Sequence, residues 1–203
     1  MANAQQNTAL PGQAALHGRA SYSSANPDGG TSGMMVAEIK HLGKLNIRGG
    51  KALAAGIKAH TGCNFPPAAN SVNSAGARHL VWLGPDEALL LCEAGKEEEL
   101  QRLLKAEFGG THHAVTNVTD GLCALQLDGA AVRQVLAKGC ALDLHPSAFV
   151  AGQCAQTMVS HAGVTLIATD ADSFLLICRT SFAPYMVDWL QDAALEYGVT
   201  VSA

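Results

Sequence analysis

The sequence predicts an α+β protein made of two tandem lobes, each with a βαββαβ order of elements and an antiparallel sheet. Two observations lead to this prediction. Residues 79–93, HLVWLGPDEALLLCE, align without a gap on residues 165–179, TLIATDADSFLLICR, and both stretches have the pattern of a β-hairpin with an Asp in its turn. An amphipathic helix pattern that ends at a glycine follows each hairpin. The chain therefore contains one structural unit twice.

The first half can be followed element by element. Residues 44–63, KLNIRGGKALAAGIKAHTGC, predict a strand, a glycine turn and a helix, and the first hairpin comes next. Residues 96–109 predict a helix that ends at Gly109, and residues 112–118, HHAVTNV, predict the last strand. The apolar face of that second helix consists of Leu100, Leu103, Leu104 and Phe108.

The second half repeats this order with small changes. Residues 124–140, ALQLDGAAVRQVLAKGC, match the first strand and helix, but the helix is about one turn shorter. An extra strand candidate, QCAQTMVS at residues 153–160, is expected in this half alone. The last strand is expected at residues 199–203. Before it, residues 182–198 predict a helix whose buried face would hold Phe182, Tyr185, Trp189, Ala193 and Tyr197.

Three regions follow from this organisation. Residues 1–35 are rich in Ala, Gly, Ser, Asn and Gln without a sustained apolar period, so we expect a flexible or partner-bound N-terminal arm. Residues 36–120 should form the first α+β lobe, and residues 121–203 should form the second.

Composition limits the classes of partner. With 203 residues, 48% of them hydrophobic, the chain can bury a proper core. The net charge of −4 comes without a run of Lys and Arg, so nucleic acid is not expected as a partner. The apolar runs are too short to span a membrane, and the first thirty residues carry no secretory signal pattern, so we expect a cytoplasmic protein.

The six cysteines are expected to be free thiols. They form no C-x-x-C pair, and most lie in or beside apolar stretches where a thiol packs as a small hydrophobe. Their positions are 63, 92, 123, 140, 154 and 178.

The duplication separates residues that the fold requires from residues that it does not. KGCALDLHPSAF, residues 138–149, places Asp143 two residues from His145, whereas the matching stretch of the first half, TGCNFPPAA, has neither an acid nor a histidine. The fold therefore does not need this pair. Either Asp143 caps backbone amides in a loop, or the pair contacts a partner or ligand.

Other stretches carry no chemical signal. The strand-to-helix turn at residues 48–56, RGGKALAAG, is neither a Walker A loop nor a G-x-G-x-x-G motif. Asp170 and Asp172 fall in a hairpin turn, where Asp is common for local reasons. No His or Cys set has zinc-site spacing, and no G-x-S-x-G motif occurs. The sequence thus predicts no catalytic, cofactor-binding or metal-binding residue.

Differences between the two copies indicate candidate contact residues. Trp82 aligns with Ala168, Arg48 with Asp128, and Arg179 with Glu93. Trp and Arg are frequent in interface hot spots, although Trp82 could equally be a core residue. The candidates for a subunit interface are therefore Arg48, Trp82, Asp143, His145 and Arg179.

Four blocks in order carry a family resemblance: LGKLNIRG (42–49), LGPDEALLLC (83–92), LAKGCALDLHPSAFVAGQCAQT (136–157) and LLICRTSFAPYMVDWLQDAALEYG (175–198). With them the chain resembles the gamma-subunit family of heterotetrameric sarcosine oxidase over roughly residues 36–200. It is also similar to the folate-binding part of the glycine cleavage T-protein, in the aminomethyltransferase family. The resemblance implies an aminomethyltransferase-like arrangement of two ferredoxin-like lobes.

The resemblance also implies a function. Such a chain would be a non-catalytic subunit of an oxidoreductase, a flavoprotein complex that demethylates sarcosine to glycine and reduces oxygen to hydrogen peroxide. Tetrahydrofolate, when present, would become the 5,10-methylene derivative. FAD, FMN, NAD and zinc would belong to the other subunits, and the partners would be the alpha, beta and delta subunits, with alpha in direct contact. The alternatives are a free-standing folate-binding or aminomethyltransferase-like protein and a homo-oligomeric scaffold.

Overall fold

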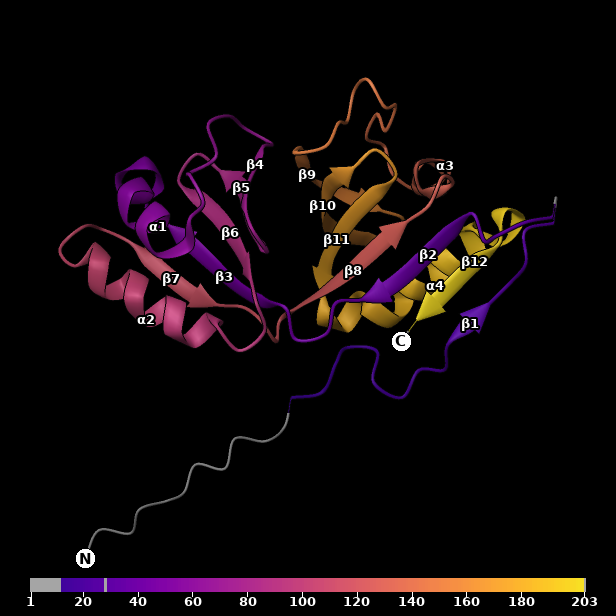
Figure 1. Cartoon of the computed structure of the whole chain (residues 1–203), viewed down its shortest axis with the longest axis horizontal. Coiled ribbons are helices and arrows are strands. Elements are labelled where there is room, and N and C mark those ends of the chain that lie inside the picture. Colours follow the sequence, from indigo (N-terminus) through magenta and orange to yellow (C-terminus); the bar gives the residue numbers. More distant parts are fainter. Residues whose placement is uncertain (1–11, 28, 203) are drawn as a thin grey trace, which may run out of the picture.

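The computed structural model describes residues 12–27 and 29–202, which form two sheets with helices packed on each (Figure 1). The five-stranded sheet has the order β4-β5-β6-β3-β7, and every pairing in it is antiparallel. Its strands are β3 (Gly43–Arg48), β4 (Val72–Ala75), β5 (Arg78–Gly84), β6 (Glu87–Cys92) and β7 (Ala114–Asn117). Its helices are η1 (Gly50–Leu53), α1 (Ala54–Thr61) and α2 (Glu97–Phe108).

The seven-stranded sheet has the order β1-β12-β2-β8-β11-β10-β9, in which only the β12–β2 pairing is parallel. Its strands are β1 (Tyr22–Ser23), β2 (Met34–Glu38), β8 (Leu122–Asp128), β9 (Cys154–Val159), β10 (Ala162–Asp170), β11 (Ser173–Arg179) and β12 (Val199–Ser202). Its helices are α3 (Val132–Ala137), η2 (Thr180–Phe182), α4 (Ala183–Ala193) and η3 (Leu195–Tyr197). The predicted α+β class with antiparallel sheets is confirmed.

The repeated unit is visible in the strand orders, but β2 interrupts it. In the five-stranded sheet the order β5-β6-β3-β7 has its counterpart in β10-β11-β8-β12, except that β2 lies between β8 and β12. Met34 and Val36 of β2 are buried in the helix-side core of the seven-stranded sheet. Residues 36–38, which we expected in the first lobe, therefore lie in the sheet of the second half, and the chain crosses between the sheets at residues 39–42 and again at 118–121.

The extra strand is present in both halves, whereas we expected it only in the second. β9 pairs with β10, and β4 pairs with β5 in the same way. The sequence of β4, VNSA, has only one large apolar residue, so hydrophobic periodicity does not reveal it. Its end joins the two sheets through a bridge between Ser71 and Gln153, supported by a 2.8 Å bond from the Cys154 N–H to the Asn70 carbonyl.

Each sheet is apolar on both faces. One face packs on the helices of its own half, with Leu90 and Leu104 in one core and Phe174 and Leu190 in the other. The opposite faces pack on each other in a third cluster. The buried members of this inter-sheet core are Val81, Leu89, Leu91, Ala124, Cys154, Ile167, Leu175 and Ile177.

The helix faces agree with the prediction for α2 but not for α4. Leu100, Leu104 and Phe108 of α2 are buried as expected. In α4 the buried face is formed instead by Ala183, Met186, Val187, Leu190 and, just after the helix, Ala194.

The aromatic residues of η2, α4 and η3 lie at the edges of that buried face. Phe182 is 39% exposed, and the hydroxyl of Tyr185 is 2.7 Å from the Ser160 hydroxyl. Four residues of the predicted face, Tyr185, Trp189, Ala193 and Tyr197, thus pack on the core but are only partly buried. An edge position gives the polar tip of a Tyr a partner.

Part of the predicted N-terminal arm is packed against the seven-stranded sheet. Leu16 is buried, and the N–H groups of Ala15 and Leu16 donate to the Glu38 carboxylate at 2.8 and 3.0 Å. β1 then pairs with β12. This differs from a flexible arm because these residues bury apolar surface and pair their backbone; residues 1–11 lie outside the described part.

All six cysteines are free and buried, as predicted. Burial raises the pKa of the Cys92 thiol from its ordinary value of 9.0 to about 11, and it raises that of Cys154 in the same way to about 11. These two thiols therefore stay protonated at pH values where an unfolded chain would have ionised them.

The first prediction concerns Gly129, which has φ 126° and approaches Gly33 so closely that a Cβ would lie 2.3 Å from the Gly33 carbonyl oxygen. We expect Gly129→Ala to lower the free energy of unfolding by about 2–4 kcal/mol, because strain and overlap add. Gly163→Ala is the control, since its Cβ would meet only the Met158 sulfur at 3.8 Å. Urea unfolding compares them; equal stability of the two variants would contradict this account.

The second prediction concerns alkaline pH. Between pH 9.0 and about 11 the unfolded state loses protons that the folded Cys92 and Cys154 thiols keep. Their raised pKa values thus contribute stability that is complete below pH 9.0 and is lost as the pH rises toward 11. We expect the urea midpoint of a Cys92→Ala/Cys154→Ala variant to fall less steeply over this range than that of the wild type. Parallel curves would count against the assignment.

Candidate functional site

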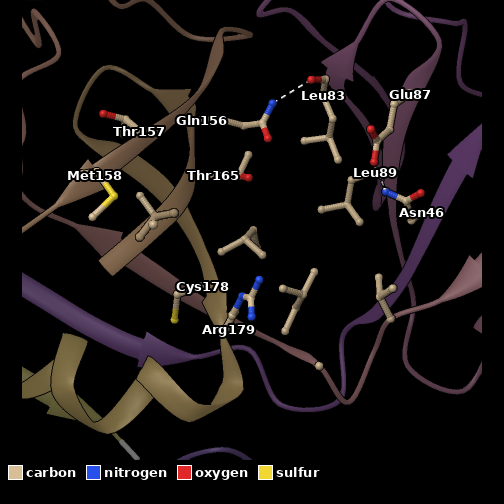
Figure 2. A pocket seen from close by; sticks show the side chains of 16 residues that line it. Asn46, Leu83, Glu87, Leu89, Gln156, Thr157, Met158, Thr165, Cys178 and Arg179 are labelled. Carbon is tan, nitrogen blue, oxygen red and sulfur yellow. Dashed lines mark hydrogen bonds between the residues drawn. The ribbon is translucent and has the colours of Figure 1, made fainter. Parts of the chain in front are cut away.

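An open cleft of about 810 Å³ lies between the two sheets, beside the inter-sheet core (Figure 2). β3, β5 and β6 supply one wall, and β9, β10 and β11 supply the other. The crossover residues Val118 and Gly121 and the first residue of β8, Leu122, complete the lining. Strand alternation builds the walls: Leu45 and Ile47 face the helices of the five-stranded sheet, so Asn46 between them faces the cleft.

The carboxylate of Glu87 on the β6 wall is neutralised within the chain. It accepts hydrogen bonds from Asn46 Nδ2 at 2.7 Å and from the Arg48 guanidinium at 2.5 Å. The hydrogen bond from Arg48 is the main cause that holds the pKa of Glu87 below its usual range. This wall therefore presents a compensated charge rather than a free carboxylate.

The guanidinium of Arg179 on the opposite wall has no such partner. It points into the cleft (Figure 2), and no other residue in 12–27 or 29–202 pairs with it or accepts a hydrogen bond from it. The first half shows why: Glu93, the counterpart of Arg179, pairs with Arg78 at 2.8 Å, but Val164 stands in the second half where Arg78 stands in the first. Arg179 is thus a cation without its ion-pair partner.

A notch lies beside Arg179 on the same wall. Met158 of β9 is the register partner of Gly163 of β10. Val164 of β10 pairs with Cys178 of β11, so the next position along these two strands places Gly163 beside Arg179. Because Gly163 has no side chain, the wall is open between the Met158 thioether and the guanidinium. Met158 itself is 50% exposed.

The lining of the cleft has the composition of a binding surface. Apolar side chains such as Leu89, Leu122 and Ile177 line most of the cleft, with one unpaired cation at the wall. Within the described ranges, no group of three or more His, Cys, Asp or Glu side chains is arranged to hold a metal ion. Within the same ranges, no helix has the length and apolarity that a membrane crossing needs.

The five candidate interface residues fall into separate places. Arg179 lines the cleft, and Arg48 lies at its margin through the ion pair with Glu87. The Arg48–Glu87 pair is replaced in the second half by a hydrogen bond from the Ser173 hydroxyl to Asp128, at 2.7 Å.

Trp82 packs on the inter-sheet core, and its carbonyl lies 3.5 Å from the Cys154 sulfur. Because the side chain is partly buried there, its position has a packing explanation within the chain. Trp82 adjoins the cleft through its neighbour Leu83, which forms part of the lining.

Asp143 and His145 lie in the loop between α3 and β9, away from the cleft. The Asp143 carboxylate accepts the His145 N–H at 2.9 Å, and His145 Nδ1 is 2.7 Å from the Ser147 hydroxyl. Both side chains are exposed. The pair therefore makes a local cap within the loop, and the histidine ring does not contact the aspartate.

Arg133 holds this loop, a role that we did not predict from the sequence. Its guanidinium donates to the carbonyls of Leu144 at 2.7 Å, Phe149 at 3.0 Å and Ala171 at 2.9 Å, and lies 4.9 Å from the centre of the Phe174 ring. The sequence feature that could have indicated this role is the position of Arg133 on the apolar face of a short predicted helix.

The turn at residues 48–56 is closed by backbone bonds. The N–H groups of Gly49 and Gly50 both donate to the Asp86 carbonyl, at 2.9 and 3.2 Å. These amides are consequently not free to hold a phosphate. The Asp170 side chain accepts the N–H of Ala171 at 2.7 Å, which is a local turn contact.

The chain matches a known protein family and relatives from two bacteria. The family described as sarcosine oxidase, gamma subunit matches residues 48–196. The chain is 31% identical over 171 residues to a sarcosine oxidase subunit gamma from Corynebacterium sp. (strain U-96), covering 83% of this chain and 82% of the relative. Its identity to the subunit gamma from Arthrobacter sp is 32% over 177 residues, covering 85% and 86%.

Solved structures agree in fold. A chain of the heterotetrameric sarcosine oxidase from Corynebacterium sp. U-96, in complex with pyrrole 2-carboxylate, superposes with a TM-score of 0.76 at 30% identity, covering 81% of this chain and 85% of that one. Glycine cleavage system aminomethyltransferase T from Bartonella henselae superposes with a TM-score of 0.61 at 15% identity, covering 84% of this chain and 48% of that one. The second likeness concerns the fold alone.

The third prediction compares the two loop residues. We expect Arg133→Met to lower the free energy of unfolding by about 2–4 kcal/mol, because the carbonyls of Leu144, Phe149 and Ala171 lose their donor and the first two of these bonds are buried. His145→Ala should cost under about 1 kcal/mol, since the ring is exposed. Urea unfolding gives the free energies, and hydrogen exchange of residues 141–150 should increase in Arg133→Met only. A larger effect of His145→Ala would refute this assignment of roles.

Proposed function

This chain belongs to the sarcosine oxidase gamma subunit family, and from that premise we propose that it is a non-catalytic subunit of a heterotetrameric sarcosine oxidase. Its role would be to bind the larger subunits and hold the complex together. The observation that carries the proposal is the cleft, an open apolar surface with the unpaired Arg179 on its wall. A surface of this kind suits a protein contact.

The reaction would be catalysed by the assembled complex. By the family resemblance, the assembly would oxidatively demethylate sarcosine to glycine, with hydrogen peroxide as the reduced product and methylenetetrahydrofolate formed when tetrahydrofolate is present. FAD, FMN, NAD and zinc would be bound by other subunits. The alpha subunit is proposed as the direct contact of this chain, with beta and delta in the same cytoplasmic complex.

The bonding of two acidic side chains and the burial of two thiols support a binding role. Glu87 is committed to Asn46 and Arg48, and Asp143 is committed to the loop backbone. The thiols of Cys92 and Cys154 are buried with raised pKa values, which makes them poor nucleophiles near neutral pH.

Folate binding by the isolated chain is the alternative from a different class. The likeness to aminomethyltransferase T supports the shared fold only, and this chain spans 48% of that protein. Calorimetry with tetrahydrofolate distinguishes the two functions, because a structural subunit should show no micromolar binding by itself.

The fourth prediction tests assembly. When the other three subunits are expressed without this chain, we expect loss of the intact complex together with lower flavin content and lower sarcosine turnover. Size-exclusion chromatography, flavin absorbance and peroxide formation measure these quantities, and re-expression of the wild-type chain is the control. Full assembly, flavin content and turnover without the chain would show that the proposed role is incorrect.

A further inference from the structure

We propose that the cleft receives a segment of a partner subunit that places an Asp or Glu carboxylate on Arg179 and an apolar side chain in the notch at Gly163. This inference rests on the proposed function and specifies the chemistry of the partner surface.

The charge of the cleft indicates that the bound segment carries a carboxylate. Arg179 is the cleft cation for which residues 12–27 and 29–202 supply no counter-ion, whereas the carboxylate of Glu87 is already compensated by Arg48 and Asn46. The cleft thus carries one uncompensated positive charge. A guanidinium presents paired N–H donors that match the two oxygens of a carboxylate. An acidic side chain is therefore the complementary group.

The shape of the notch at Gly163 indicates that the bound segment carries an apolar side chain beside the carboxylate. The notch between Met158 and Arg179 exists because Gly163 has no side chain, and a Cβ added there would meet only the Met158 sulfur, at 3.8 Å. Thioethers adapt to the shape of an incoming apolar group. An apolar residue next to the acidic one would fill this space and cover Met158, which is 50% exposed.

Size favours a polypeptide over a small acid. The cleft has a volume of about 810 Å³, and its lining extends from Asn46 on β3 to Met158 on β9. A free amino acid on Arg179 would leave most of the apolar lining in water. A polypeptide segment covers the apolar lining and pairs the cation at the same time, as in the buried centre of an interface.

Competition for incorporation tests the proposal on the full chain. Tagged variant and untagged wild-type chains are co-expressed with the other three subunits, and mass spectrometry measures their ratio in the purified complex. We expect Arg179→Glu and Gly163→Leu each to be incorporated at least about tenfold less than the wild type. Urea unfolding of each purified variant confirms that it is folded.

Two matched controls come from the same chain. Arg102→Glu makes the same charge change at an exposed arginine on α2, and Gly110→Leu adds the same side chain where nothing lies within 4 Å. Both should be incorporated as well as the wild type. Equal incorporation of the cleft variants and these controls would overturn the inference while leaving the proposed function intact.

A photocrosslinking amino acid at Met158 identifies the occupant. The expected product joins this chain to a segment of another subunit that contains Asp or Glu beside an apolar residue, and Gly163→Leu should remove that product. A crosslink to a second copy of this chain, or to a segment without an acidic residue, would overturn the inference. If the wild-type chain itself is missing from the purified complex, the proposed function fails first.

Discussion

Leu89 and Leu91 of one sheet share an apolar cluster with Leu175 and Ile177 of the other, and the rest of the structure depends on this contact. β6 and β11 are apolar on both faces, so helices alone cannot bury them. The second face of each sheet is covered by the other sheet. This packing brings β4 beside β9, allows the Ser71–Gln153 bridge, and leaves the cleft where the two walls separate.

The two copies of the unit differ in ways that determine what the cleft presents. An ion pair in the first half, between Arg78 and Glu93, becomes Val164 and Arg179 in the second, so one cation is left without its partner. At another cross-strand position the change is compensated, because Arg48–Glu87 is replaced by the Asp128–Ser173 hydrogen bond. Duplication thus conserves the core while allowing a surface charge on one copy to become available for contact.

Local pattern predicted much of the fold. The hairpins, the apolar face of α2, the free thiols and the strand β9 all follow from periodicity and from comparison of the two halves.

The parts of the fold that could not be predicted depend on pairing between residues far apart in the sequence. The insertion of β2 between β8 and β12 depends on contacts with residues far along the chain, and β4 has too little apolar character to be detected alone. The cleft escaped prediction because its walls come from different halves. Arg179 was singled out by its asymmetry, but its missing partner became visible only when Arg78 and Glu93 were seen to pair.

We propose that this chain contributes a contact surface rather than a reactive site. An electron-microscopy map of the assembled complex, at a resolution that shows side chains, tests it most directly. The account predicts polypeptide density from another subunit in the cleft, with a carboxylate within hydrogen-bonding distance of the Arg179 guanidinium. A cleft that faces solvent in the intact complex, or one that holds substrate or a cofactor, would contradict it.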